Sequence, residues 1–99
     1  MFEIRFAVDV ERDLRGIKAP DRRRILDTLE EQLSHEPNLE TKNRKILVNL
    51  TPPFETVPPV WELRIGDYRA FYDVDEEQEV VYVRAVRRKS PHKTTEEIL

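Results

Sequence analysis

The first third of the chain carries two kinds of hydrophobic spacing. Apolar side chains at every second position from Phe2 to Val8 are typical of a half-buried strand. Asp9 is a candidate cap for a short helix in which apolar residues recur at Val10, Leu14 and Ile17. Pro20 then suits the start of a longer helix that we expect to stop at Pro37. Four residues form the apolar stripe of this second helix: Ile25, Leu26, Leu29 and Leu33.

The segment from 38 to 59 has no regular period. Five of the seven prolines lie between Pro37 and Pro59, and the two Pro-Pro pairs prevent regular ladder pairing at those positions. An apolar run from Ile46 to Leu50 is compatible with either a strand fragment or a packed loop, and the pattern does not separate the two. We therefore expect a rigid connection of unassigned structure.

The pattern from Trp61 to Tyr72 predicts a β-hairpin. Gly66 and Asp67 suit the two central positions of a type II′ turn, so that Ile65 opposes Tyr68 and every other pair follows from that register. One face of this hairpin is then apolar, with Trp61, Leu63, Ile65, Tyr68, Ala70 and Tyr72. The other face carries Glu62, Arg64, Arg69, Phe71 and Asp73, with the two arginines directly opposed.

The sequence pattern in the last third of the chain predicts one more strand and a short helical turn at the C-terminus. An apolar run from Val80 to Val86 indicates a central strand covered on both faces. A basic tail follows, in which Thr94 or Thr95 is a candidate cap for a final helical turn. The predicted order is β-α-α-β-β-β with a C-terminal stub. This order indicates an α+β fold with two helices on one face of a mostly antiparallel sheet, in a single domain over residues 1–99.

Composition narrows the class of protein. A charged fraction of 37% with 38% hydrophobic residues fits a globular domain with a charged surface, and the absence of cysteine excludes disulfides, thiolate zinc sites and cysteine nucleophiles. No window approaches the roughly 18 apolar residues of a membrane span, and the first residues lack a signal pattern, so we expect a cytoplasmic protein without membrane contact.

Charge is distributed unevenly along the chain. The net charge is −3, yet residues 84–93 contain five basic residues and no acid. A local positive field therefore survives inside a mildly acidic protein. This basic arm has the arginines, lysines and single histidine that RNA cleavage without a metal needs.

The opposed pair Arg64 and Arg69 needs a compensating negative charge, because like charges across a sheet repel. Glu62 and Asp73 on the same face could supply this charge from within the protein, which would make the pair purely structural. A bound phosphate could supply it instead, which would make the pair a binding site. Phe71 on that face is a candidate for base stacking. The basic residues at 42, 44 and 45 fit either a substrate contact or ordinary solvated charge. The two histidines show no metal-ligand spacing, and two glycines make no phosphate loop, so we expect no metal and no cofactor.

Residues 61–72, WELRIGDYRAFY, resemble the aromatic-x-Leu-Arg-Val-Gly-Asp-Tyr-Arg hairpin of the RelE/ParE superfamily, the toxins of type II toxin–antitoxin systems. The preceding helices match in order, so the resemblance covers nearly the whole chain. RelE-like members are ribosome-dependent endonucleases that cut mRNA without a metal and inhibit translation. ParE-like members share the fold and poison DNA gyrase. The resemblance implies a RelE-like toxin, with a gyrase-directed toxin or a weakly catalytic antitoxin-binding module as the alternatives.

The resemblance also implies roles for single residues. Arg69 matches the hairpin arginine that contacts the scissile phosphate, and Arg88 or Lys89 matches the basic residue beyond the last strand. The tail departs from the family pattern by lacking a terminal tyrosine, and His92 is the candidate base there. The expected catalytic residues are Arg69, Arg88, Lys89 and His92. The expected RNA contacts are Arg64, Lys42, Arg44, Lys45, Arg87 and Lys93. The expected partners are a cognate antitoxin with the ribosome and mRNA, or DNA gyrase in the alternative.

Overall fold

The computed structural model describes all residues from 1 to 99, and its centre is one five-stranded sheet. The strands are β1 (Glu3–Phe6), β2 (Arg44–Ile46), β3 (Trp61–Ile65), β4 (Tyr68–Asp75) and β5 (Val80–Arg88), in the spatial order β1-β5-β4-β3-β2. Only β1 and β5 pair in parallel, and all other neighbours are antiparallel. The predicted α+β class with a mostly antiparallel sheet is confirmed, and β5 is an interior strand as its apolar run predicts.

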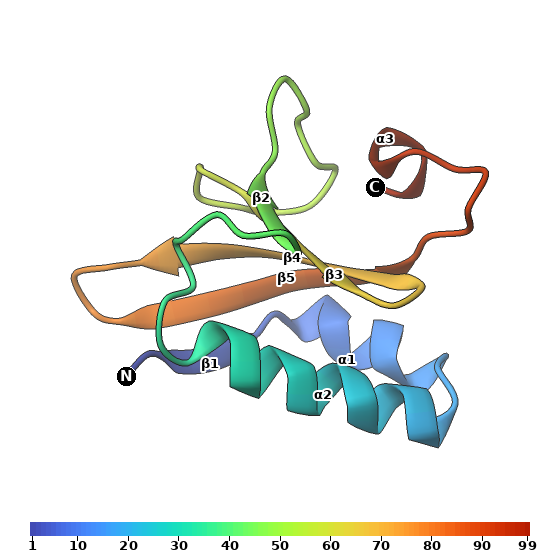
Figure 1. Ribbon diagram of the computed structural model, residues 1–99, viewed down its shortest axis with the longest axis horizontal. Coiled ribbons are helices and arrows are strands. Elements are labelled where there is room, and N and C mark those ends of the chain that lie inside the picture. Colours follow the sequence, from blue (N-terminus) through green and yellow to red (C-terminus); the bar gives the residue numbers. More distant parts are fainter.

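Two helices cover one face of this sheet, as Figure 1 shows. They are α1 (Val8–Arg15) and α2 (Ala19–Leu33), and Pro20 lies in the first turn of α2 as predicted. The stripe of α2 buries Ile25, Leu29 and Leu33 completely, whereas Leu26 keeps 37% of its surface exposed. No helix has both the length and the apolar character needed to cross a membrane.

Two predicted helix boundaries are wrong. The cap position of α1 is Ala7, so Asp9 lies inside the first turn, where a carboxylate still interacts favourably with the helix dipole. The helix α2 ends at Leu33 rather than at Pro37. A residue far away in the sequence binds the end of this helix: the Phe2 N–H donates to the Ser34 carbonyl at 2.7 Å, in place of an N–H from a further helical turn.

The β3–β4 hairpin has the predicted register. Arg64 pairs with Arg69 and Ile65 with Tyr68, and the positive φ of 57° at Gly66, with none at Asp67, matches a type II′ turn. The apolar face of this hairpin packs under the helices, where the rings of Trp61 and Tyr72 stack at 6.1 Å between centroids. The turn therefore fixes which side chains enter the main core.

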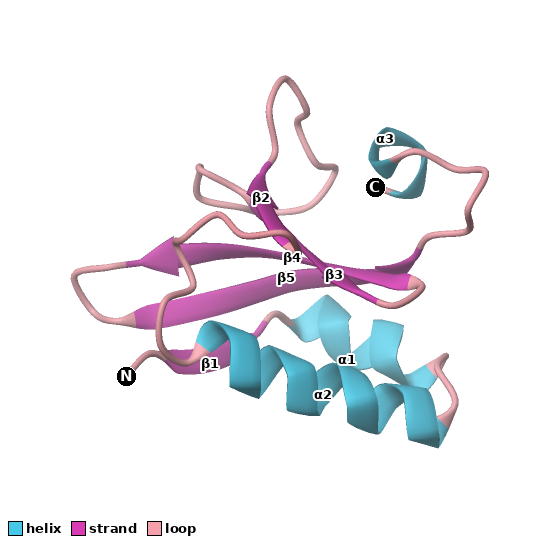
Figure 2. Ribbon diagram, viewed as in Figure 1, coloured by secondary structure: helices cyan, strands magenta, loops and turns pink.

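The opposite face of the sheet, here called the second face, is partly covered by the loops around β2 and by the C-terminal segment (Figure 2). Four buried residues form a small core there: Val60, Phe71, Ala85 and Ile98. Phe71 is fully buried, so the expectation that its ring is open for base stacking is wrong. The reason is that the segment from 38 to 59, which the sequence left unassigned, supplies β2 and then folds Phe54 onto this face, where Val60 follows it.

The C-terminal stub is the helix α3 (Thr95–Ile98). Thr94 and Glu97 form a capping box, in which the backbone and side chain of Thr94 donate hydrogen bonds to Glu97 and lower the pKa of its carboxyl. The Thr95 hydroxyl donates to Glu62 at 2.7 Å, and Ile98 is buried in the small core. The tail is therefore fastened across the second face.

Replacing Gly66 by alanine is expected to reduce the free energy of unfolding by about 1–2 kcal/mol, because an L side chain is strained at positive φ. The new methyl group would also stand 2.8 Å from the Arg24 guanidinium, which is flexible enough to move. Urea denaturation measures the change. The matched control is Gly16→Ala, at φ −79° with 3.7 Å to its nearest neighbour, which should lose no stability. An equal loss in both variants would contradict the turn assignment.

Candidate functional site

A polar cavity of about 310 Å³ opens on the second face beside the hairpin. No hydrophobic residue and no acidic residue lines it, and six of its nine lining residues are lysine or arginine. The lining residues are Thr41, Lys42, Asn43, Arg44, Lys45, Arg64, Arg69, Lys89 and Thr95. This basic cavity brings together six of the ten residues predicted to contact RNA or to act in catalysis.

The sheet places the cations of the basic cavity by alternation. Arg64 on β3 lies opposite Arg69 on β4, and both project to the second face. β5 continues beside the hairpin until the Lys89 N–H donates to the Asp67 carbonyl at 2.7 Å. Lys89 therefore reaches the same face, two residues beyond Arg87, which pairs with Arg69. The N–H of Arg64 donates to Asn43 at 2.8 Å, which holds the loop before β2 against the cavity.

Arg69 is the most constrained cation in the basic cavity. Its Nη1 donates to the carbonyls of Gly66 at 2.9 Å and Tyr68 at 2.8 Å. Partial burial lowers the pKa of Arg69, the charge of Glu62 opposes that shift, and the charge of Arg64 adds to it. The guanidinium is thus held in one orientation by backbone oxygens, which leaves its positive charge uncancelled by any ion pair.

The carboxylates that were considered as compensators have other partners. Asp73 accepts from the Arg84 guanidinium at 2.7 and 3.2 Å and from the N–H of Val57 at 3.0 Å. Glu62, only 3% exposed, accepts from Thr95 and forms an ion pair with Lys45 at 3.5 Å. Neither Arg64 nor Arg69 forms an ion pair, so the pair presents net positive charge to the cavity.

Arg44 has a structural role within the basic cavity. It is 8% exposed, and its Nη1 donates to the carbonyls of Gln32 at 2.9 Å and Glu36 at 2.6 Å. These carbonyls lie at and just beyond the end of α2, where no helical N–H is left to bind them. Arg44 therefore uses its donors on the end of the helix, whereas Lys42 is exposed without a partner and Lys45 is exposed while paired with Glu62.

Four predicted site residues lie outside the basic cavity. Arg87 donates to Asp13 at 2.8 Å and stands 5.7 Å from the centroid of the Phe54 ring. Arg88 projects to the helix side, where it lines a different cavity with Lys18 and Arg24. His92 and Lys93 are exposed in the segment after β5 and line no cavity. Of the two basic residues considered for this position, Lys89 therefore lies on the second face and Arg88 does not.

Three cavity residues were absent from the sequence prediction. Thr41, Asn43 and Thr95 add polar groups to the basic cavity. Thr41 and Asn43 belong to the unassigned segment, and the place of Thr95 depends on how the tail folds back, so no local pattern pointed to them. No group of three or more histidines, aspartates or glutamates is close enough to hold a metal ion.

One family model matches most of this chain. Residues 4–91 match the family model described as the ParE toxin of the type II toxin–antitoxin system parDE. A search of curated protein sequences found no match. The RelBE2 complex from Mycobacterium tuberculosis contains a chain with 23% identity and a TM-score of 0.72, over 89% of this chain and 98% of that chain.

Two further solved structures share the fold. A chain of the RelE–RelB complex from Pyrococcus horikoshii has 21% identity and a TM-score of 0.69, over 91% of this chain and 97% of that chain. The isolated RelE toxin from E. coli has 22% identity and a TM-score of 0.64, over 98% of this chain and 94% of that chain. At this identity the likeness shows a common RelE-like fold.

Replacing Arg44 by alanine is expected to reduce the free energy of unfolding by about 2–4 kcal/mol, because it leaves two carbonyls at the end of α2 without a donor. Thermal and urea unfolding measure the loss. Lys42→Ala is the control, since Lys42 is exposed and has no hydrogen-bond partner, and it should change stability by no more than about 0.5 kcal/mol. Equal stability of the two variants would show that Arg44 does not hold the helix end.

Proposed function

We propose that this chain, which belongs to the ParE toxin family of type II toxin–antitoxin systems within the RelE/ParE superfamily, acts on mRNA as an endonuclease that inhibits translation. The observation that carries the proposal is the pair Arg64 and Arg69, held side by side in the basic cavity without a carboxylate partner. Guanidinium groups have the geometry to bind phosphate oxygens in pairs. Lys42, Lys45 and Lys89 extend that charge along a bound strand.

The chemistry that this site supports is attack of an RNA 2′-oxygen on the adjacent phosphorus. The new P–O2′ bond forms as the P–O5′ bond breaks, leaving a cyclic phosphate and a free 5′-hydroxyl, which takes up the proton lost from the 2′-hydroxyl. Arg64 and Arg69 stabilise the additional negative charge of the transition state. Lys89, on the same face, is the cation available to the leaving 5′-oxygen, whereas Arg88 lies on the helix side.

A general base is the part of this chemistry that the basic cavity does not supply. It contains no histidine and no acid, and His92 is exposed outside it. The proposal therefore assigns the chain the roles of binding, orienting and charge stabilisation. We expect the cleavage to depend on the ribosome because the chain resembles RelE-like toxins, which cut mRNA in the decoding site.

We also propose an antitoxin as the cognate partner, in the cytoplasm. The family is defined by toxin–antitoxin pairs, and the relatives from M. tuberculosis and P. horikoshii are complexes of RelE and RelB type. An acidic segment that lies on the basic cavity would neutralise it, and such segments commonly fold as they bind.

A gyrase-directed toxin is the second candidate function. Two observations favour it: the matching family model is that of ParE, and the basic cavity contains no histidine and no carboxylate that could act as a general base. In this case the cations would contact protein or DNA phosphates and no RNA bond would be cut.

Expression without the antitoxin is expected to arrest growth and to create new mRNA 5′ ends, mapped by sequencing. Arg69→Ala should lower cleavage by about 100-fold or more, the usual loss when a donor to the transition state is removed. Arg64→Ala should lower it as well, and this variant removes no hydrogen bond within the protein. Arg88→Ala, on the opposite face, is the matched control and should retain cleavage.

The same cultures distinguish the candidates. Growth arrest with unchanged mRNA ends and with loss of negative supercoiling in a reporter plasmid would replace the endonuclease by the gyrase-directed toxin. If the protein is soluble and abundant, causes neither effect and still binds its antitoxin, it acts only as an antitoxin-binding module. Equal cleavage by Arg64→Ala and the wild type would remove the arginine pair from the site.

A further inference from the structure

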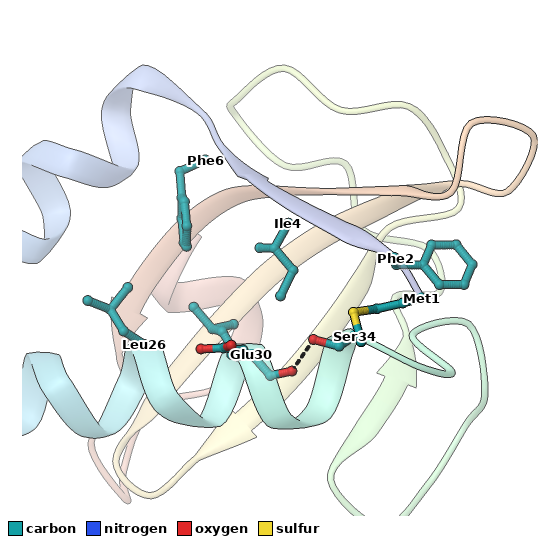
Figure 3. Close-up of a pocket in the computed structure, with 8 residues that line it drawn as sticks. Met1, Phe2, Ile4, Phe6, Leu26, Glu30 and Ser34 are labelled. Carbon is teal, nitrogen blue, oxygen red and sulfur yellow. Dashed lines mark hydrogen bonds between the residues drawn. The ribbon is translucent and has the colours of Figure 1, made fainter.

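The cavities of this protein differ in what they offer to a nucleotide. The groove between β1 and α2, which Figure 3 shows with Ile4 beside Glu30, has a volume of about 360 Å³. Six of its eight lining residues are hydrophobic, and no lysine or arginine is among them. A nucleotide phosphate therefore has no cation to bind in this groove. The basic cavity is the opposite case, because cations make up most of its lining and no hydrophobic side chain contributes to it.

Recognition of a base in the basic cavity depends on hydrogen bonds. Phe71 is fully buried and no aromatic residue lines the cavity, so no ring is open there for a base to stack on. The lysines and arginines of the cavity carry hydrogen-bond donors only. A base edge that places a donor beside an acceptor needs a neutral side chain that has both.

Three neutral side chains line the basic cavity: Thr41, Asn43 and Thr95. The Thr95 hydroxyl donates its hydrogen to Glu62 at 2.7 Å. The Thr41 hydroxyl oxygen accepts the backbone N–H of Asn43 at 3.2 Å, within the turn before β2. The side-chain amide of Asn43 is exposed and makes no hydrogen bond within the chain, so its two N–H donors and its oxygen are open to a ligand.

The backbone places Asn43 next to the arginine pair. The Arg64 N–H donates to the Asn43 carbonyl at 2.8 Å, and Arg64 in turn pairs with Arg69. The three residues thus form a row from the start of β2 across β3 to β4, and all three line the basic cavity. A base is joined to its phosphate through a single ribose. A nucleotide whose phosphate lies on the two arginines therefore has its base within reach of the next residue in the row.

The fold does not require an amide at position 43. The backbone holds the turn, because the Thr41 N–H donates to the Arg44 carbonyl at 3.0 Å and the Arg44 N–H donates back at 3.3 Å. The contact of Asn43 with β3 uses its carbonyl, which every residue has. The amide of Asn43 is therefore free for binding, and its removal should leave the turn intact.

The amide of asparagine matches adenine better than the other bases. Adenine presents a donor beside an acceptor on two edges, with its amino group next to N7 on one and next to N1 on the other. The corresponding N7 edge of guanine has two acceptors, and cytosine and uracil each have a single polar group on that side. Adenine therefore pairs with an amide in either orientation of the base, whereas each of the other bases does so on one edge only.

We propose that Asn43 is a specificity-determining residue of the basic cavity and selects adenine in the nucleotide whose phosphate lies on Arg64 and Arg69. This inference rests on the proposed function for the phosphate-binding role of the arginine pair, and it adds a base preference to that role. Asn43 hydrogen-bonds the base and does not contact the phosphate. Its removal therefore changes which nucleotide is preferred and leaves the charge of the site unchanged.

Titration of the purified full-length protein with single nucleotides, followed by NMR, tests this preference. The ligands are the 3′- and 5′-monophosphates of the four ribonucleosides, with inorganic phosphate as the probe that has no base. In one of the two series, the adenine nucleotide should bind about tenfold more tightly than the other three, which is a typical discrimination for a bidentate pair. Asn43→Ala should remove that difference and leave the affinity for inorganic phosphate unchanged.

Two further variants are the controls. Asn38→Ala removes an asparagine that lines a different cavity beside Asp73 and Glu76, and this variant should keep the adenine preference. Arg64→Ala should weaken the binding of every ligand, including inorganic phosphate. Equal affinity of the wild type for all four bases in both series would overturn the proposal. An adenine preference that survives Asn43→Ala would overturn it as well.

The base preference and the endonuclease activity can fail separately. If Asn43 confers an adenine preference on nucleotide binding while mRNA 5′ ends stay unchanged in cells, the role of Asn43 stands and the endonuclease is wrong. If mRNA is cut and the wild type and Asn43→Ala cut at the same bases, the endonuclease stands and the role of Asn43 is wrong. Binding of neither inorganic phosphate nor any nucleotide would remove the phosphate site and this inference together.

Discussion

The two-residue turn at Gly66 and Asp67 is the constraint on which the rest of the structure depends. With a loop of two residues, no shift of register is possible without moving every side chain of β3 and β4 to the wrong face. The apolar residues of both strands therefore lie under α1 and α2, and the arginine pair lies on the second face. The main core and the candidate site are fixed by the same turn, so a change in one would disturb the other.

Opposed arginines cost stability, and the structure offsets the cost without cancelling the charge. Arg69 donates to backbone carbonyls of its own turn, and the negative charge of Glu62, which is bound to Thr95 and Lys45, acts favourably on it. Carbonyl dipoles orient a guanidinium but leave its net charge intact. This is the arrangement expected of a phosphate site, in which the last partner of the cations is supplied by the ligand.

The second face combines two environments within a short distance. Phe71, Ala85 and Ile98 form a dry core under the C-terminal segment, and the basic cavity opens directly beside it. Thr95 connects the two, because it lines the cavity and its hydrogen bond to Glu62 fastens α3, which carries Ile98 into the core. The tail is thus part of the wall of the site, to which Thr95 contributes a hydroxyl group.

The sequence by itself determined the α+β class, the order of the main elements, the hairpin register and the identity of its arginine face. These features follow from local rules: strand alternation, helical spacing and turn chemistry operate over a few residues. The gathering of Arg64, Arg69 and Lys89 was likewise anticipated, since two of them share a hairpin. The sequence did not show whether Arg88 or Lys89 joins the arginine pair. The apolar run ends at Val86, but β5 continues to Arg88 and turns that side chain toward the helices.

Only the tertiary structure decided where α2 ends, what covers Phe71 and what Arg44 does. Each depends on groups far apart in the chain: Phe2 binds Ser34, Phe54 packs on Phe71, and Arg44 binds carbonyls at the end of α2. A buried arginine and a solvated one have the same local pattern, since what separates them is the presence of acceptors that folding brings near. The chemistry of a side chain can be read from the sequence, but its availability depends on the partners that packing supplies.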